Sequence, residues 1–210
     1  MHIKKNNAQQ EYCPHSSKFV TSPHSHKAKP TMPILNFEFK AKTTELDNLE
    51  KKLLELNPKF IGEDNQTDTY FNVTTGRLKL REGNIENSLI YYERQNTAGA
   101  KQSDVLLYRH NPDKTLKDIL IKLHGIKVIV EKIRKIYFID NVKFHFDSIA
   151  ELGTFIEVEA IDKNGNIGIE KLKEQANKYA AFFNIKPSDY ISLSYSDLIL
   201  QSTENKKTGV

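Results

Sequence analysis

Apolar and polar residues alternate along several short segments of the chain, the pattern of β-strands whose two faces meet different surroundings. In the first such segment Phe37 and Phe39 alternate with Glu38 and Lys40. Eight strands are predicted in this way: Ile34–Lys42, Asp68–Val73, Leu78–Glu82, Leu89–Gln95, Val105–His110, Val128–Tyr137, Val142–Asp147 and Thr154–Ala160. Eight strands of this length are typical of a β-barrel or a β-sandwich.

Three further segments repeat their apolar residues at helical spacing. They are Thr44–Leu56, Leu116–His124 and Ile169–Phe183. Gly125 follows the second segment, and glycine is a favoured residue just after the end of a helix. The mixture predicts an α+β fold, in which an antiparallel eight-stranded barrel, or tunnel, has helices packed on its outside.

The charged residues of the predicted strands are sorted by sign. Residues two apart share a face of a strand, so a single face collects several charges of one kind. The basic positions are Arg77, Lys79 and Arg81 in one strand, Arg94 in the next, and Lys132 and Arg134 in a later one. Glu157 and Glu159 share an acidic face, while Lys143, His145 and Asp147 form a mixed one.

Two interpretations of this sorting are open. A polar face is ordinary where one side of an antiparallel sheet meets water. However, like charges directly opposite one another are destabilising, so a solvated face more often mixes the signs. If the charged face lines a tunnel, the clustered cations require a polyanion and the clustered carboxylates require a cation. A triphosphate with bound Mg²⁺ supplies both, because guanidinium groups match phosphate oxygens and Mg²⁺ prefers oxygen ligands.

The net charge of +4 comes from the first 33 residues, which contain five lysines and one acid. Residues 34–210 are therefore neutral, and this argues against a nucleic-acid partner, which normally requires a basic face. Residues 1–33 and 201–210 are polar and are predicted to be disordered; Met32 is an alternative start of the chain. One cysteine and no long apolar run favour a cytoplasmic protein without a membrane partner.

The strand motifs together resemble those of CYTH proteins. Asn36-Phe-Glu38-Phe-Lys40 is similar to the N-terminal ExExK signature of that superfamily, which includes class IV adenylyl cyclases and thiamine triphosphatases. The similarity continues in order through Asp68-Thr-Tyr-Phe, Gly76-Arg-Leu-Lys-Leu-Arg81, Tyr92-Glu-Arg94, Glu131-Lys-Ile-Arg134, Phe146-Asp147, Leu152-Gly-Thr-Phe-Ile-Glu-Val-Glu159 and Ser194-Tyr-Ser-Asp-Leu198. It covers about residues 34–200, which would form one catalytic domain, and is greatest toward the class IV cyclase branch.

The resemblance implies a role for each matching residue. Metal ligands for Mg²⁺ or Mn²⁺ would be Glu38, Glu157, Glu159 and Asp147. The triphosphate would be bound by Lys40, Lys79, Arg81, Arg94, Lys132 and Arg134, with Arg77 on the same face. Asn36 stands where the signature has Glu, which puts a two-metal arrangement in question. The resemblance also allows a homodimer.

The same binding residues serve two reactions. In a class IV adenylyl cyclase the ribose 3′-hydroxyl of ATP attacks the α-phosphorus and pyrophosphate leaves, whereas in a triphosphatase water attacks the terminal phosphorus of inorganic triphosphate, thiamine triphosphate or a nucleoside triphosphate. A non-catalytic binder of nucleotides or polyphosphate is a third alternative. The general base is not identified by the sequence; for His145, a structural role is preferred to that of a base. Ser194, Tyr195 and Ser196 are interpreted as packing and turn residues, and Asp68 and Tyr70 as residues that can face inward.

Overall fold

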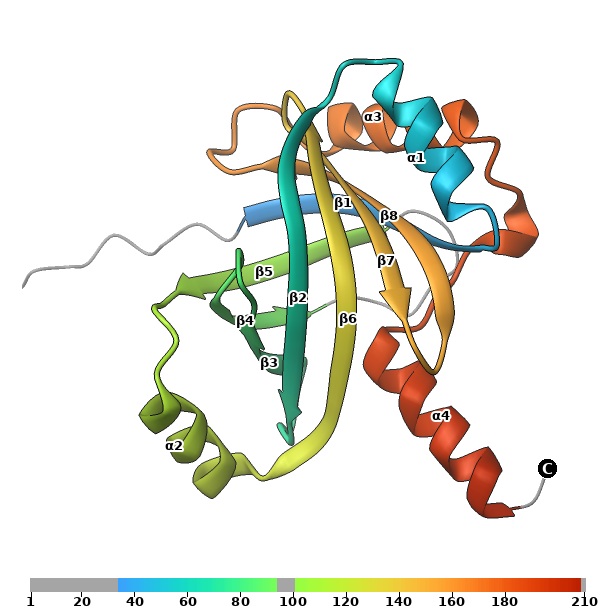
Figure 1. Ribbon diagram of the computed structural model, residues 1–210. Helices are drawn as coiled ribbons and strands as arrows, with labels where there is room; N and C mark the ends of the chain where they lie inside the picture. The colour runs from blue at the N-terminus through green and yellow to red at the C-terminus, as the bar shows by residue number, and fades with distance from the viewer. Residues whose placement is uncertain (1–33, 94–100, 209–210) are drawn as a thin grey trace, which may run out of the picture. The chain divides into compact units, whose positions relative to one another are not determined.

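The computed structural model describes residues 34–93 and 101–208, and within them eight antiparallel strands close into a barrel (Figure 1). The strands follow one another around the barrel in the order β1-β5-β4-β3-β2-β6-β7-β8. Their bounds are β1 Ile34–Thr43, β2 Lys59–Phe71, β3 Arg77–Glu82, β4 Ser88–Glu93, β5 Lys101–Arg109, β6 Ile126–Ile139, β7 Val142–Ile149 and β8 Gly153–Asp162. The predicted antiparallel eight-stranded barrel is confirmed.

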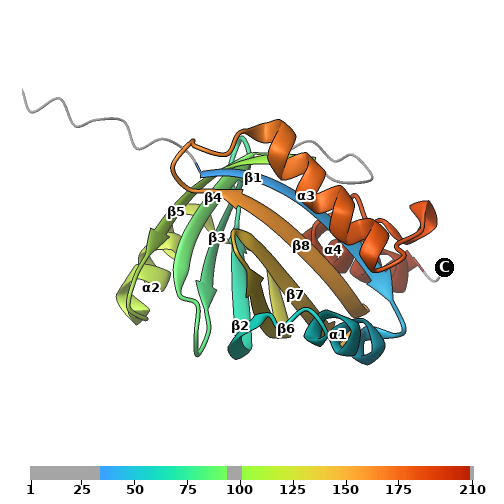
Figure 2. The ribbon, with the colours of Figure 1, turned by 90° about the horizontal axis from the view of Figure 1, so that it is seen from above.

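Two helices cover the outer face of β1, β7 and β8. These are α1 (Leu46–Leu54) and α3 (Ile169–Phe182), which lie against the barrel wall in Figure 2. Leu53 of α1 and Leu172 of α3 are fully buried against outward-facing residues such as Phe39 and Phe144. The apolar residues of these strands therefore form a core outside the barrel, and their charged neighbours in the sequence point inside it.

A third helix, α2 (Lys114–His124), packs Leu120 onto Phe71 and Leu80 on the outside of β2 and β3. Asp113 caps it by accepting a hydrogen bond from the backbone N–H of Thr115 at 2.7 Å. All three predicted helices are thus present.

Sequence reasoning missed α4 (Tyr195–Thr208), which follows a short 3₁₀ turn at Pro187–Asp189. Its first turn packs Tyr195 and Leu198 against Tyr70, Val130 and Phe155, which point inward at one end of the barrel. Beyond Leu200 the helix is polar and without apolar periodicity, so composition alone predicted fraying there; the chain is helical through Thr208.

Strand β2 begins at Lys59, nine residues before the predicted start at Asp68. The prediction missed its first half because this part is mostly polar and lacks an apolar alternation. Some of these polar residues are buried, among them Asp64 and Gln66. The predicted tail of residues 1–33 and the predicted binding residue Arg94 lie outside the described residues. No helix in the described part of the chain is long and apolar enough to span a membrane.

Candidate active site

The barrel encloses a cavity of about 590 Å³ to which every strand contributes side chains. This volume is in the range of cavities that bind small molecules. The predicted binding residues Lys40, Lys79, Arg81, Lys132 and Arg134 all line it, together with the predicted metal ligands Glu38, Glu157 and Glu159. The sorted charges thus face an enclosed space and not bulk water.

Three of the cations share one carboxylate, that of Asp68 on β2. Arg81 donates two hydrogen bonds to it, at 2.8 and 3.0 Å, and Lys79 and Lys132 donate at 3.0 and 2.8 Å. Burial alone would raise the pKa of Asp68, but Arg81, Lys132 and Lys79 together hold that pKa well below its ordinary value. Two carboxylates, those of Asp68 and of Glu86, which contacts Arg81 at 3.0 Å, therefore face three cations, and this part of the cavity keeps a positive excess.

Burial, together with the positive excess, lowers the pKa of Lys132. Its side chain is fully buried, and burial, with Arg81, Arg134 and Lys79 nearby, lowers its pKa from 10.5 to about 7 although Asp68 opposes the shift. The ion pair with Asp68 does not prevent this, because the same carboxylate serves Lys79 and Arg81 as well. A polyanion placed here would favour the protonated ammonium.

Carboxylates gather on the opposite side, where β1 pairs with β8. Glu38 lies directly across from Glu159, and Lys40 lies across from Glu157. Lys40 forms an ion pair with Glu157 at 3.3 Å, and Asn36 donates a hydrogen bond to Glu38 at 3.0 Å. Burial raises the pKa of Glu159 to about 7; Lys143 opposes this shift, and the charges of Glu157 and Glu38 add to it.

The turn between β3 and β4 positions one more acid, Glu86, in the cavity lining. Asp64 on β2 accepts hydrogen bonds from the backbone N–H groups of Ile85 and Glu86, at 2.8 and 3.0 Å. The turn between β3 and β4 is held in this way, and Glu86 reaches Arg81 at 3.0 Å and Lys143 at 2.5 Å. A side chain at Gly83 would collide with Asp64, since a Cβ there would lie 2.5 Å from its Oδ1.

A family model described as the CYTH domain matches residues 35–184, which is more than two thirds of the chain. The chain belongs to the CYTH domain family. A curated protein of Methanocaldococcus jannaschii, named "Putative adenylate cyclase MJ0240", is 25% identical over 174 residues, which are 79% of this chain and 98% of that protein.

Two solved structures share the CYTH barrel. The PH1012 protein of Pyrococcus horikoshii OT3 matches with a TM-score of 0.67 at 22% identity, over 78% of this chain and 98% of that one. HpAC1 from Hippeastrum, described as a "putative adenylyl cyclase" with a dominant triphosphatase activity, matches with a TM-score of 0.53 at 12% identity, over 81% of this chain and 96% of that one. At these identities the likeness establishes the fold.

CYTH enzymes are metal-dependent, and the carboxylates of this chain fit such a metal. Glu38 and Glu159 are direct cross-strand partners inside the cavity, and like charges in that arrangement repel unless a cation lies between them. The pKa of Glu159 is raised first by burial, and the charges of Glu157 and Glu38 add to the rise. Carboxylate oxygens are the ligands that Mg²⁺ and Mn²⁺ prefer.

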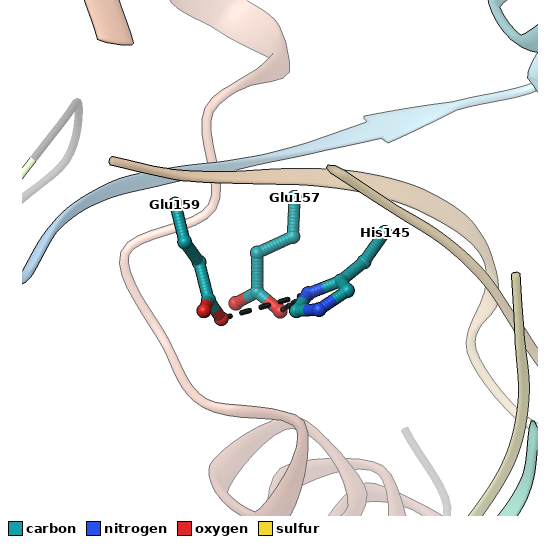
Figure 3. Close-up of side chains that lie close together, drawn as sticks. All are labelled: His145, Glu157 and Glu159. Carbon is teal, nitrogen blue, oxygen red and sulfur yellow. Dashed lines mark hydrogen bonds and ion pairs between the residues drawn. The ribbon is translucent and has the colours of Figure 1, made fainter. Parts of the chain in front are cut away.

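His145 on β7 lies beside Glu157 with its ring directed at the carboxylates of Glu157 and Glu159 (Figure 3), and it is not among the residues that line the cavity. Its Nδ1 is 3.2 Å from Glu157 Oε2 and 3.5 Å from Glu159 Oε1. Burial and the charges of Arg134 and Lys143 lower the pKa of His145 to about 3, so the ring is neutral. Nδ1 can then carry the proton and donate it in a hydrogen bond to Glu157, which fixes that carboxylate in place and suits a structural role.

The CYTH barrel here is tied to helix α4 through Tyr195. The Tyr195 hydroxyl donates to Asp147 Oδ2 at 2.7 Å, and Arg134 donates to both oxygens of Asp147 at 2.6 and 2.5 Å. Arg134 also reaches Glu157 at 2.8 Å. The ammonium of Lys40 lies over the Tyr195 ring, 4.0 Å from its centroid. Tyr195 therefore contacts Lys40 directly and Arg134 through Asp147.

Two predicted site residues lie elsewhere. Arg77 does not line the cavity and forms an ion pair with Asp197 of α4 at 2.9 Å. Asp147 does not line the cavity; it is fully buried and accepts hydrogen bonds from Arg134 and Tyr195, so it positions Arg134, and its role as a metal ligand stays a prediction. Periodicity could not separate these two residues from the lining residues, because each shares its strand face with residues that do line the cavity.

Sequence reasoning assigned no binding role to four residues that line the cavity: Asp68, which it interpreted only as able to face inward, Lys143, which it placed only on a charged face, Tyr195, which it interpreted as a packing residue, and Glu86. Asp68 and Lys143 could have been found, since both lie on predicted strands, and Lys143 shares its face with His145. Glu86 depends on the Asp64-bound turn, and Tyr195 on the docking of α4, which no local pattern indicates.

Proposed function

We propose that this protein is a divalent-metal-dependent enzyme that acts on a triphosphate held inside the barrel. One observation carries the proposal: Lys79, Arg81 and Lys132 converge in an enclosed cavity around the single carboxylate of Asp68. Their uncompensated charge suits a polyanion, and it lies across the same cavity from the carboxylates that suit a metal ion.

The cations divide into two chemical kinds. Arg81 and Arg134 offer planar guanidinium groups, which bind two phosphate oxygens at once and so set the orientation of the phosphate. Lys79 and Lys132 offer compact charges that hold phosphate oxygens without fixing their direction. Arg134 is itself held on both sides by Asp147 and Glu157, so its position is set before a substrate arrives.

Glu38 and Glu159, with Glu157 beside them, would hold Mg²⁺ or Mn²⁺, which when bound neutralises phosphate charge and assists the nucleophile. The protein's own contribution is to position the phosphates and to exclude water from between charged groups, where electrostatic interactions are strong. Lys40 lies between Glu157 and the Tyr195 ring and can contact a phosphate at the border of the two regions.

Adenylate cyclisation is the first assignment of the reaction. The ribose 3′-hydroxyl would attack the α-phosphorus of ATP and pyrophosphate would leave. The name of the Methanocaldococcus relative, which is similar over 79% of this chain, supports this assignment. A triphosphatase is the second candidate, in which water attacks the terminal phosphorus and orthophosphate leaves; the description of HpAC1 favours it.

A panel of substrates tests the proposal and separates the two reactions. The full-length protein is incubated with ATP, tripolyphosphate and thiamine triphosphate, each with Mg²⁺ or Mn²⁺. Cyclic AMP with pyrophosphate identifies the cyclase, and orthophosphate identifies a triphosphatase. Binding without turnover would identify the third alternative, a non-catalytic binder.

A matched pair of variants ties the activity to the cavity. Lys132→Ala should lower kcat/KM by at least a hundredfold, because it removes a charged hydrogen-bond donor that lies fully inside the barrel. Lys127→Ala, on the same strand but exposed, should leave the rate unchanged. Wild-type protein that neither binds nor converts any of the three triphosphates would contradict the proposal.

A further inference from the structure

The cavity has two chemically different walls. The charged side chains come mainly from β1, β2, β3, β6, β7 and β8, whereas the described side chains of β4 and β5 in the lining are uncharged apart from Arg109. Ile90 and Val105 are the apolar part of this neutral wall, and Leu107 lies at its mouth. A metal-bound chain of phosphates would satisfy the charged wall and leave the neutral wall uncovered.

Two buried polar atoms, one on the neutral wall and one beside it on β1, have no hydrogen-bond partner among the described residues. They are Oδ1 of Asn36 and Oγ of Ser103. The two residues are only 7% and 2% exposed, both line the cavity, and they are directly opposite each other where β1 pairs with β5. Most buried polar groups in proteins are paired, so two adjacent exceptions facing one cavity indicate a ligand.

The chemistry of Asn36 restricts what that ligand can be. Its Nδ2 donates to Glu38 at 3.0 Å, and because a carboxylate only accepts hydrogen bonds, the amide nitrogen must be the atom on that side. Oδ1 is therefore the atom left without a partner, and it can only accept. Ionised phosphate oxygens are also acceptors and cannot satisfy it. The partner is therefore a metal ion or a group that carries an N–H or O–H, and ionised inorganic triphosphate is neither.

We propose that Asn36 and Ser103 form a subsite for the uncharged organic part of the substrate, a nucleoside. Its hydroxyl or amino groups donate to Asn36 Oδ1 and exchange a hydrogen bond with Ser103, while the flat base packs on Ile90 and Val105. The inference rests on the proposed function, because the organic part reaches this wall only when its triphosphate is held by the charged one. The subsite also explains why Asn36 stands where the CYTH signature has Glu. A Glu here would offer another carboxylate to the metal, but it would not offer an amide oxygen to the nucleoside.

Direct binding of two ligands tests the subsite. Calorimetric titration of the full-length protein, with Mg²⁺ present, compares tripolyphosphate with an ATP analogue whose phosphate bridges are methylene groups. The wild-type protein should bind the analogue at least fivefold more tightly. Ser103→Ala should weaken binding of the analogue about fivefold, the effect of one neutral hydrogen bond, and change the Kd of tripolyphosphate by less than twofold.

Ser103→Thr keeps the hydroxyl and should retain preference for the analogue, which separates a lost hydrogen bond from a disturbed strand. Ser148→Ala, on an exposed position of β7, is the control for serine removal and should change neither Kd. Equal binding of the two ligands by the wild type, or equal weakening of both by Ser103→Ala, overturns the subsite and leaves the proposed function intact. If the wild type binds neither ligand, the proposed function fails and the subsite with it.

Discussion

Triphosphate binding should take up a proton at Lys132. In the ligand-free protein burial and three neighbouring cations lower the pKa of this lysine to about 7, so it is mostly neutral in mildly alkaline solution. A bound triphosphate brings negative charge to the ammonium and raises its pKa. Because the bound form then holds a proton that the free form lacks, affinity must fall as the pH rises above 7.

The size of the proton uptake follows from the pKa of about 7 for Lys132 in the ligand-free protein. If the bound lysine stays protonated, uptake is about 0.8 proton at pH 7.5 and approaches one at pH 8.5. Over the same interval the Kd should rise about eightfold, close to the limit of tenfold for each pH unit. The terminal phosphate titrates near pH 6 and contributes little in this range.

Isothermal titration calorimetry with tripolyphosphate and saturating Mg²⁺ measures the proton uptake if it is repeated in buffers of different ionisation enthalpy. Lys132→Arg is the matched control, because a guanidinium stays charged throughout and should abolish both the proton uptake and the fall in affinity. Uptake below about 0.2 proton at pH 8.5, or equal uptake by the arginine variant, would refute this interpretation of the cavity charge.

Three further variants test other parts of the site. Glu159→Gln should abolish metal-dependent turnover yet stabilise the metal-free protein at pH 8 by about 1–3 kcal/mol in urea unfolding. The reason is that the pKa of this carboxyl is raised to about 7 in the folded protein, so ionising it lowers the free energy of unfolding of the wild type as the pH rises from 4.5 to 7. Unchanged metal binding would exclude Glu159 as a ligand. Asp68→Asn should destabilise the free protein by about 3–5 kcal/mol, and tripolyphosphate should raise its Tm more than that of the wild type; a smaller rise would contradict the shared role of Asp68. Tyr195→Phe removes a hydrogen-bond donor from Asp147 but keeps the ring under Lys40; it should raise KM for the triphosphate severalfold and alter kcat less. Tyr195→Leu removes the ring as well and should raise KM further and lower kcat; equal effects of the two variants would mean that the ring contact with Lys40 is not used.

Period-two patterning was sufficient to find most of the charged lining. Glu38 and Lys40, like Glu157 and Glu159, were assigned to one face because residues two apart in a strand point the same way, and the structure places all four in the cavity. The sign sorting also favoured an enclosed face over a solvated one. A strand's periodicity depends only on its own backbone, which explains why this part of the prediction transfers to the folded chain.

Periodicity could not show where each charge is neutralised. The clustered cations were expected to require an external polyanion, whereas Asp68 from a neighbouring strand already neutralises part of their charge. Such pairs join residues far apart in the sequence, as Lys132 and Asp68 are. The first half of β2 was missed for a related reason, since Asp64 and Gln66 are polar residues that the fold buries.

Helix α4 shows the other limit of sequence reasoning. Its apolar residues occupy only the first turns, so no long amphipathic stripe indicates a helix. Its importance comes from the place where it docks, at the end of the barrel where Tyr195 reaches Asp147 and Lys40. Only the closed barrel brings these three residues together.

The most direct test of the account is a crystal structure of the protein with tripolyphosphate and Mn²⁺. The predicted result places phosphate oxygens within hydrogen-bond distance of Lys79, Arg81 and Lys132 inside the barrel, with anomalous Mn²⁺ density between Glu38 and Glu159. Tripolyphosphate bound on the outer surface, with the cavity side chains still paired only to one another, would contradict it.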